Sequence, residues 1–187
     1  MLTLIIGPMF SGKSTELLKK MNRAVLARKK TCLVRPHMDT RSHLTHDFAK
    51  IAPGVDIYVI ENYSLENPDI SKILEYNTIC FDEWQFFPES AWDNFIFPLL
   101  KTIQDKDKDC YIAGLSNNFH LKPFAILSLT LPLANHIEVQ SAICIQCGKS
   151  ASYTSLKGAE STDDVVGSRE KYDALCWHCY RKNHPVS

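Results

Sequence analysis

The sequence predicts an α/β fold in which a parallel sheet carries helices on both of its faces, followed by a small cysteine-rich module. Short runs that are apolar throughout, as in strands buried on both faces of a parallel sheet, alternate with segments of helical periodicity. The last third of the chain changes to two Cys-x-x-Cys pairs and polar linkers. Because this change falls near residues 138–142, we expect an α/β domain over 1–140 and a module over 141–187.

Each element follows from its local pattern. The predicted strands are the apolar runs 2–6, 31–35, 56–60, 78–82 and 110–114. A helix is expected where apolar residues recur at helical spacing over 17–25, and two more over 68–76 and 89–104. Pro98 should kink or end the last of these. The polar segment 36–54 predicts a long mobile loop, and 156–171 a second polar loop between the cysteine pairs.

Composition and charge exclude several classes of protein. The 187 residues are 45% hydrophobic and 22% charged, which is typical of a globular chain and excludes global disorder. Lys and Arg number 21 and balance 21 Asp and Glu, which disfavours a dedicated nucleic-acid binder. No apolar stretch approaches the roughly 18 residues of a membrane span. The first residues lack the basic start of a secretory signal, so we expect a cytoplasmic protein.

A phosphate-binding loop is predicted where GPMFSGKS fits the pattern G-x-x-x-x-G-K-[ST] between a strand and a helix. Backbone N–H groups would wrap a phosphate at the start of the helix, Lys13 would reach the β and γ oxygens, and Ser14 would ligate Mg²⁺. An ordinary glycine-rich turn is the alternative, but motif and context agree. The candidate residues for binding ATP are Gly7, Pro8, Met9, Phe10, Ser11, Gly12, Lys13 and Ser14.

Two adjacent acids end the fourth predicted strand, at the edge of the sheet where nucleotides bind. Asp82 would join the Mg²⁺ shell, and Glu83 would deprotonate the hydroxyl that attacks the γ-phosphate. Alone, two acids after a strand are more often a solvated turn or a helix cap. Their combination with a phosphate-binding loop favours a catalytic pair.

Four of the seven cysteines form the two pairs. Cys144, Cys147, Cys176 and Cys179 have the spacing of a tetrahedral, structural Zn²⁺ site with no open coordination position, as in a zinc ribbon. A thioredoxin-type redox pair is the competing interpretation, although it would not need a second copy. The three single cysteines lie in or beside apolar segments and are given no chemistry.

Aromatic residues follow the ends of two predicted strands, where they could flank a planar ligand or belong to the core. Those after the acid pair are Trp84, Phe86 and Phe87, and Phe119 follows the last strand. Spacing alone does not decide between the two roles. For Asp39 and Arg41, in the polar loop, the pattern favours solvated surface charges.

The complete set of motifs resembles the zinc-containing type II thymidine kinases, the family of the human cytosolic enzyme. The motifs span essentially the whole chain in the family's order: GPMFSGKST, DTR, THD, DEWQFF, AGL with KPF, C-x2-C, AxYT, VVG and CxxCY. The resemblance implies transfer of the ATP γ-phosphate to the 5′-hydroxyl of thymidine or deoxyuridine. It also implies a homotetramer that is subject to feedback inhibition by deoxythymidine triphosphate.

The resemblance also assigns roles residue by residue. Glu83 matches the proton acceptor, and Phe119 matches an aromatic beside the nucleoside, with Leu115 and Phe124 in the same pocket. The matches to segments that contact ATP or its metal are Asp39, Thr40, Arg41, Asp82, Glu83, Trp84 and Gln85. The matches to a lasso that covers thymidine as a lid are Asp163, Asp164, Val165, Val166, Gly167 and Tyr172.

Three positions depart from the family pattern. Ser116 stands where the family commonly has Asp, Leu156 where an Arg is common, and Ser168 where a second Gly is usual. None of them alters Lys13 or Glu83, so the chemistry should be retained, while lid closure, assembly or inhibitor response is where differences are expected.

Two other functions stay open at this point. One is a nucleotide-switched ATPase whose zinc ribbon binds nucleic acid or a protein partner, against which the neutral charge weighs. The other is a silent homologue acting as a binding protein, which the presence of both Lys13 and Glu83 disfavours.

Overall fold

The computed structural model describes residues 1–37, 53–157 and 171–184. Six parallel strands form one sheet in the order β3-β2-β4-β5-β1-β6. Their bounds are β1 Leu2–Gly7, β2 Thr31–Pro36, β3 Val55–Ile60, β4 Thr78–Phe81, β5 Asp109–Leu115 and β6 His136–Val139. The predicted α/β class and its parallel sheet are confirmed. The edge strand β6 was not among the predicted strands.

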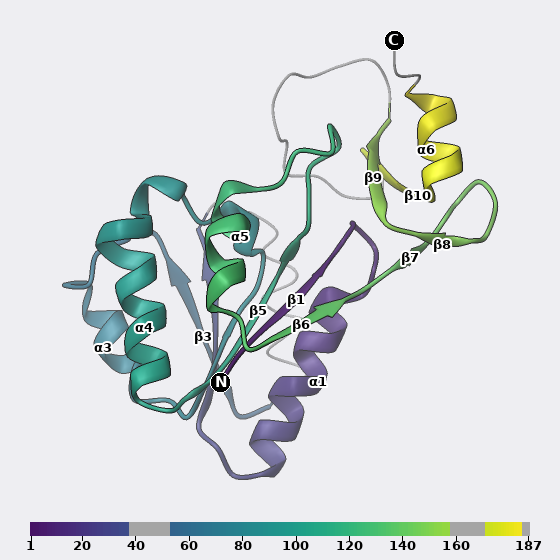
Figure 1. Cartoon of the computed structure of the whole chain (residues 1–187). Coiled ribbons are helices and arrows are strands. Elements are labelled where there is room, and N and C mark those ends of the chain that lie inside the picture. Colours follow the sequence, from purple (N-terminus) through teal and green to yellow (C-terminus); the bar gives the residue numbers. More distant parts are fainter. Residues whose placement is uncertain (38–52, 158–170, 185–187) are drawn as a thin grey trace.

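Helices cover both faces of this sheet, as the sequence predicts (Figure 1). One face packs against α1 (Lys13–Leu26), and the opposite face packs against the other three helices. These are α3 (Pro68–Ile73), α4 (Phe97–Asp105) and α5 (Ala125–Thr130). Side chains of a strand point alternately to the two faces. Leu4 therefore packs in the core beneath α4 and α5, while its neighbour Ile5 packs beneath α1.

The segment expected to be one helix over 89–104 is divided into three consecutive pieces of different helical geometry. A 3₁₀ turn (Glu89–Ala91) leads into a π-helical turn (Trp92–Ile96), and α4 follows it. Pro98 lies in the first turn of α4, where its missing N–H costs no helical hydrogen bond. The proline therefore marks the start of the α-helix, and not a kink within it.

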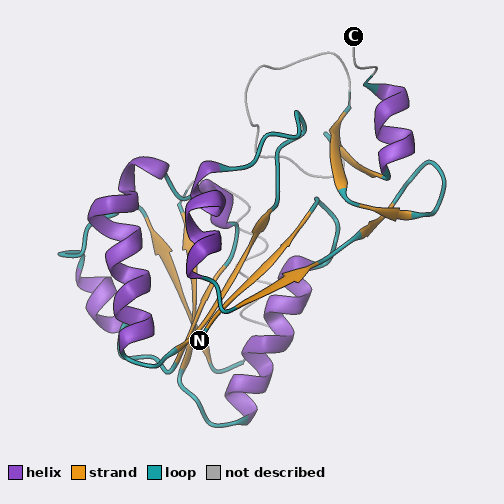
Figure 2. Ribbon diagram, in the orientation of Figure 1, coloured by secondary structure: helices purple, strands orange, loops and turns teal. Residues whose placement is uncertain are grey.

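The cysteine-rich part has its own small apolar cluster, separate from those of the sheet. The cysteine-rich part consists of two antiparallel strand pairs and one helix. The elements are β7 (Ala142–Ile143), β8 (Ser150–Ala151), β9 (Tyr153–Leu156), β10 (Tyr172–Leu175) and α6 (Trp177–Asn183). Figure 2 shows them beyond the ends of β1 and β5. We call residues 142–157 and 171–184 the cysteine module.

The helices also bear on membrane insertion. None of those in the described ranges has the length and apolar character needed to cross a bilayer.

Gly7, at the end of β1, is required by a close backbone approach. A Cβ there would lie 2.4 Å from the carbonyl oxygen of Gln140 and 2.8 Å from Ser11 Oγ. The residue after β6 thus presses against the start of the phosphate-binding loop.

We expect Gly7→Ala to lower the free energy of unfolding by about 1–3 kcal/mol, because the added methyl group overpacks this contact. Urea denaturation measures the change. Ser71→Ala, at an exposed position of α3, should shift stability by less than about 0.5 kcal/mol. An unchanged midpoint for Gly7→Ala would show that the Gln140 backbone can withdraw at no cost.

Candidate functional site

The predicted phosphate-binding loop connects β1 to α1. Its backbone takes the left-handed conformation at Phe10 (φ 64°) and at Gly12 (φ 81°), and Gly12 caps the helix. Within the loop, Ser11 Oγ donates a hydrogen bond of 2.8 Å to the carbonyl oxygen of Pro8, and Lys13 Nζ donates one of 2.6 Å to the same atom. The N-terminus of a long helix and a lysine therefore meet at one loop, which suits an anion.

Asp82 brings the second predicted motif to this loop. Ser14 Oγ lies 3.1 and 3.3 Å from the two carboxylate oxygens of Asp82, which is 2% exposed. Burial raises the pKa of Asp82 to about 7, and the neighbouring Glu83 carboxylate adds to the rise. The Glu83 N–H, the Arg35 guanidinium and the Ser14 hydroxyl oppose it. A hydroxyl and a carboxylate held together at a phosphate loop are donors that Mg²⁺ prefers.

Glu83 directly follows and has an unusual backbone. Its φ of 54° lies in the left-handed region, which costs energy for a residue other than glycine and is found most often at functional positions. Gln85 fixes the Glu83 side chain, because Gln85 Nε2 donates to Glu83 Oε2. Gln85 Oε1 in turn accepts a 3.0 Å hydrogen bond from the N–H of Leu115, at the end of β5. The Glu83 carboxylate is thus anchored through Gln85 to the adjacent strand.

The aromatic candidates divide between the core and this edge of the sheet. Trp84 is 1% exposed and donates from Nε1 to Thr130 Oγ1 at 2.9 Å, so its side chain lies inside the main core. Phe124 also packs against that core. Phe119 is nearly buried, with its ring 6.2 Å from that of Tyr172. The structure therefore joins Phe119 to the cysteine module, although Tyr172 lies 53 positions later in the chain.

The four paired cysteines converge as predicted. Their sulfur atoms all lie within 4.8 Å of one another. A tetrahedral Zn²⁺ with Zn–S bonds of about 2.3 Å needs sulfurs roughly 3.8 Å apart, so the cluster fits this metal. Burial opposes ionisation of Cys144, but hydrogen bonds from the backbones of Cys176, Gln146 and Cys147 lower its pKa to about 6. At Cys144 the backbone therefore favours the thiolate that a metal requires.

Three residues at the site were not singled out from the sequence. Thr154 accepts a hydrogen bond from the N–H of Met9 in the phosphate loop, and Tyr180 donates one to the carbonyl oxygen of Phe119. Arg35, 2% exposed, contributes positive potential at Asp82. An arginine ending an otherwise apolar strand was the available signal for Arg35. Thr154 lies in the AxYT motif and Tyr180 in CxxCY, but neither motif by itself indicates a contact.

Two groups of predicted residues lie outside the described part of the chain. They are Asp39, Thr40 and Arg41 of the ATP-associated loop, and Asp163, Asp164, Val165, Val166 and Gly167 of the lasso. Their roles stay predictions.

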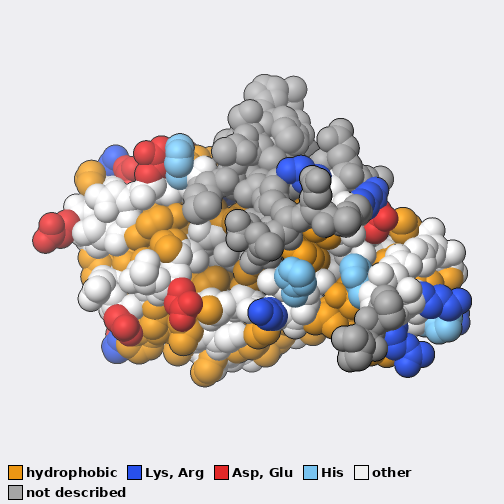
Figure 3. Space-filling model, turned by 90° about the horizontal axis from the view of Figure 1, so that it is seen from above, with side chains coloured by type: hydrophobic (Ala, Val, Ile, Leu, Met, Phe, Trp, Pro, Cys, Tyr) orange, Lys and Arg blue, Asp and Glu red, His pale blue; other side chains and the backbone are white. Residues whose placement is uncertain are grey.

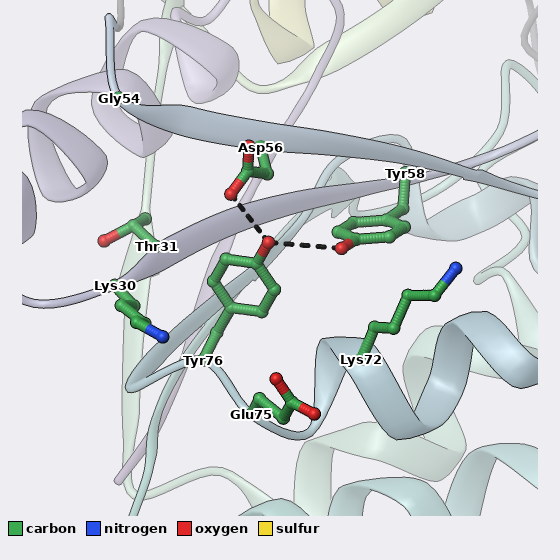
Figure 4. Close-up of a pocket in the computed structure, with 8 residues that line it drawn as sticks. All are labelled: Lys30, Thr31, Gly54, Asp56, Tyr58, Lys72, Glu75 and Tyr76. Atoms are coloured by element: carbon green, nitrogen blue, oxygen red, sulfur yellow. Dashed lines mark hydrogen bonds between the residues drawn. The ribbon is translucent and has the colours of Figure 1, made fainter.

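A separate depression of about 350 Å³ lies at the opposite end of the sheet, near the starts of β2 and β3 (Figure 4). In it, Tyr76 Oη donates to Asp56 at 2.6 Å and lies 3.1 Å from Tyr58 Oη. Three of the lining polar groups thus bond to one another. None of the predicted site residues lines it.

Comparisons with known proteins agree with this geometry. A family model described as thymidine kinase matches residues 1–180. A thymidine kinase from Pseudothermotoga lettingae is 34% identical over 97% of this chain and 95% of its own length. One from raccoon poxvirus is 32% identical over 95% and 94%, and the human cytosolic thymidine kinase is 32% identical over 95% and 72%. The chain therefore belongs to the thymidine kinase family.

Proposed function

We propose that this chain, which phosphorylates thymidine with ATP as members of its family do, attaches the γ-phosphate to the 5′-hydroxyl and also accepts deoxyuridine. The observation that carries the proposal is the contact of Ser14 with Asp82. It joins the phosphate-binding loop to the acid pair, so the donor phosphate and a general base would meet at one place. In-line transfer needs this arrangement, since its catalysis is mostly positioning and charge neutralisation.

The phosphate side of the site would work through the loop residues. The backbone amides of the loop and the Lys13 ammonium would hold the β- and γ-phosphates. The Ser14 hydroxyl and the Asp82 carboxylate would bind Mg²⁺, which when bound neutralises charge on the phosphate oxygens.

Glu83 would accept the proton of the 5′-hydroxyl. Its anchoring by Gln85 supports this role, because a general base must be held within hydrogen-bond reach of the proton it takes. On the nucleoside side, Leu115, Phe119, Phe124 and Tyr172 would form the pocket. The nearly buried pair of Phe119 and Tyr172 supports this arrangement most directly.

The cysteine cluster would bind one structural Zn²⁺, whose binding energy would hold the module folded. From that base the loop between β9 and β10 would cover the nucleoside as a lid, excluding water from the transfer and limiting ATP hydrolysis. A division of the chain into 1–140 and 141–187 is consistent with the separate apolar cluster of the module.

The remaining proposals rest on the family resemblance. They are a homotetramer, feedback inhibition by deoxythymidine triphosphate, and a cytoplasmic location like that in the name of the human relative. Exposed apolar residues on the edge strand β6, Ile137 and Val139, are compatible with an interface.

A nucleotide-switched ATPase that binds nucleic acid is less well supported. The view in Figure 3 shows Lys and Arg side chains at several separate places among apolar ones. A dedicated nucleic-acid surface would gather them in one stripe or patch.

Replacing the proposed base tests the chemistry. We expect Glu83→Gln to lower kcat for thymidine about 10²- to 10⁴-fold, because the amide cannot accept the proton. Turnover of Mg²⁺-ATP is measured with thymidine, deoxyuridine, deoxycytidine or no nucleoside, and the product is identified by mass.

Glu89→Gln, at an exposed acid nearby, is the matched control and should keep the kcat of the parent. ATP hydrolysis that no nucleoside alters would overturn the kinase and leave the ATPase.

Asp82→Asn tests the buried carboxylate through stability. The pKa of Asp82 in the folded chain, about 7, exceeds its ordinary value of 3.8. The parent therefore loses stability as pH rises from about 4 to 7, because ionisation is costlier in the folded state. In buffer without Mg²⁺, the variant should be a few kcal/mol more stable than the parent at pH 8, at about 1.4 kcal/mol per pKa unit.

Near pH 3 the difference should largely vanish, because the parent carboxyl is then protonated in both its folded and its unfolded state. Denaturant titrations at several pH values measure the difference. A difference that does not change with pH would show that burial of the charge has no cost. Activity should be lost in the variant at every pH.

Removing sulfur ligands tests the metal. We expect Cys144→Ser with Cys176→Ser to reduce bound zinc from one per chain to below a tenth, and to raise the KM for thymidine as the module loosens. Metal analysis of the purified protein and steady-state kinetics measure both effects. Cys110→Ala, at a buried thiol outside the cluster, should retain its zinc. Full thymidine affinity and stability in the double variant would break the proposed link between metal and lid.

A further inference from the structure

We propose that two buried hydroxyl groups of the cysteine module, those of Thr154 and Tyr180, separately position the two halves of the kinase site. Thr154 would hold the phosphate-binding loop, and Tyr180 would hold the loop that carries Phe119. The inference rests on the proposed function, because it concerns the segments that would bind ATP and nucleoside. Both act as positioning residues, through backbone atoms of the α/β part.

The first contact joins β9 to the phosphate-binding loop. Thr154 is 3% exposed, and its Oγ1 accepts a 3.0 Å hydrogen bond from the N–H of Met9, 145 positions earlier in the chain. Thr154 pairs with Ala174 in β10, and β10 ends directly before Cys176. Thr154 therefore lies on a strand pair that leads directly into the cysteine cluster.

The contact reaches a part of the phosphate-binding loop that has no regular secondary structure. Its backbone is left-handed at Phe10 and Gly12, so a regular helix or strand cannot continue through it. Met9 lies at the second variable position of the G-x-x-x-x-G-K-S pattern, immediately before this twisted part. With its N–H fixed by the protein, the following amides are oriented before a phosphate arrives. This preorganisation lowers the cost of binding.

The second contact joins α6 to the proposed nucleoside side. Tyr180 Oη donates a 2.6 Å hydrogen bond to the carbonyl oxygen of Phe119, and both residues are 6% exposed. Tyr180 directly follows Cys179, and its ring packs against that of His184 with centroids 4.5 Å apart. A side chain held this firmly can fix the backbone of Phe119, whose ring faces Tyr172 at 6.2 Å.

The two contacts bear on different substrates, so their effects should separate. We expect Thr154→Val, which keeps the shape but removes the hydroxyl, to raise the KM for ATP about three- to tenfold, the loss typical of one hydrogen bond. The KM for thymidine should change less than twofold. Tyr180→Phe should show the opposite split, with the KM for thymidine raised and that for ATP retained.

Three further measurements separate positioning from general damage. Thr154→Ser restores a hydroxyl and should recover the KM for ATP. Ser155→Ala is the matched control, because Ser155 is the adjacent buried hydroxyl on β9 and bonds to His184 within the module. It should leave both KM values unchanged. Binding of a non-hydrolysable ATP analogue without nucleoside, measured by calorimetry, should weaken in Thr154→Val alone.

The outcomes also distinguish this inference from the proposed function. If the parent protein does not phosphorylate thymidine, the proposed function fails. If the parent is active and the variants keep both KM values, or raise both equally, the inference is wrong and the hydroxyls serve only the stability of the module. Zinc content and thermal unfolding of each variant, measured alongside, identify loss of folding as the cause of an equal rise.

Discussion

The parallel pairing of β1 and β4 with the strand between them, β5, is the constraint on which the whole site depends. Leu4 of β1 and Phe81 of β4 both align with Ile112 of β5, so β1 and β4 are in register with each other across β5. The strand ends therefore deliver the phosphate-binding loop and the acid pair to the same edge of the sheet. The hydrogen bond from Ser14 to Asp82 is the direct consequence of this register.

Asp82 shows that function and stability oppose each other at this edge. The side chain is buried, and that burial raises its pKa to about 7, although Ser14, Arg35 and the Glu83 N–H stabilise the ionised form. A cation bound between Asp82 and the phosphates would favour the carboxylate further. The left-handed backbone of Glu83 adds a second local cost at the same turn. The apolar core on both faces of the sheet must compensate for both.

The cysteine module supports the site structurally. It would affect the reaction only by holding two loops of the site in place. Its strands and helix bury a small apolar cluster, too small to be stable alone without a further constraint such as a bound metal. Through Thr154 and Tyr180 the module contacts backbone atoms of two loops at the carboxyl ends of the strands. The position of those loops therefore depends on the folding of the module. The cysteine cluster can thus affect the site without taking part in the transfer itself.

The sequence by itself determined the α/β class, the phosphate-binding loop and the acid pair, because each follows from local periodicity or from close spacing. The two Cys-x-x-Cys pairs predicted the convergence of the four cysteines, and the order of the motifs along the chain carried the family resemblance. Only the tertiary structure decided that β6 adds to the sheet, that the side chain of Trp84 lies in the core, and that Thr154 and Tyr180 reach Met9 and Phe119. These features depend on contacts between residues far apart in the chain, some of them with backbone atoms. Such contacts leave no pattern in the local sequence. Every residue type except proline has a backbone N–H, and every residue type has a carbonyl oxygen.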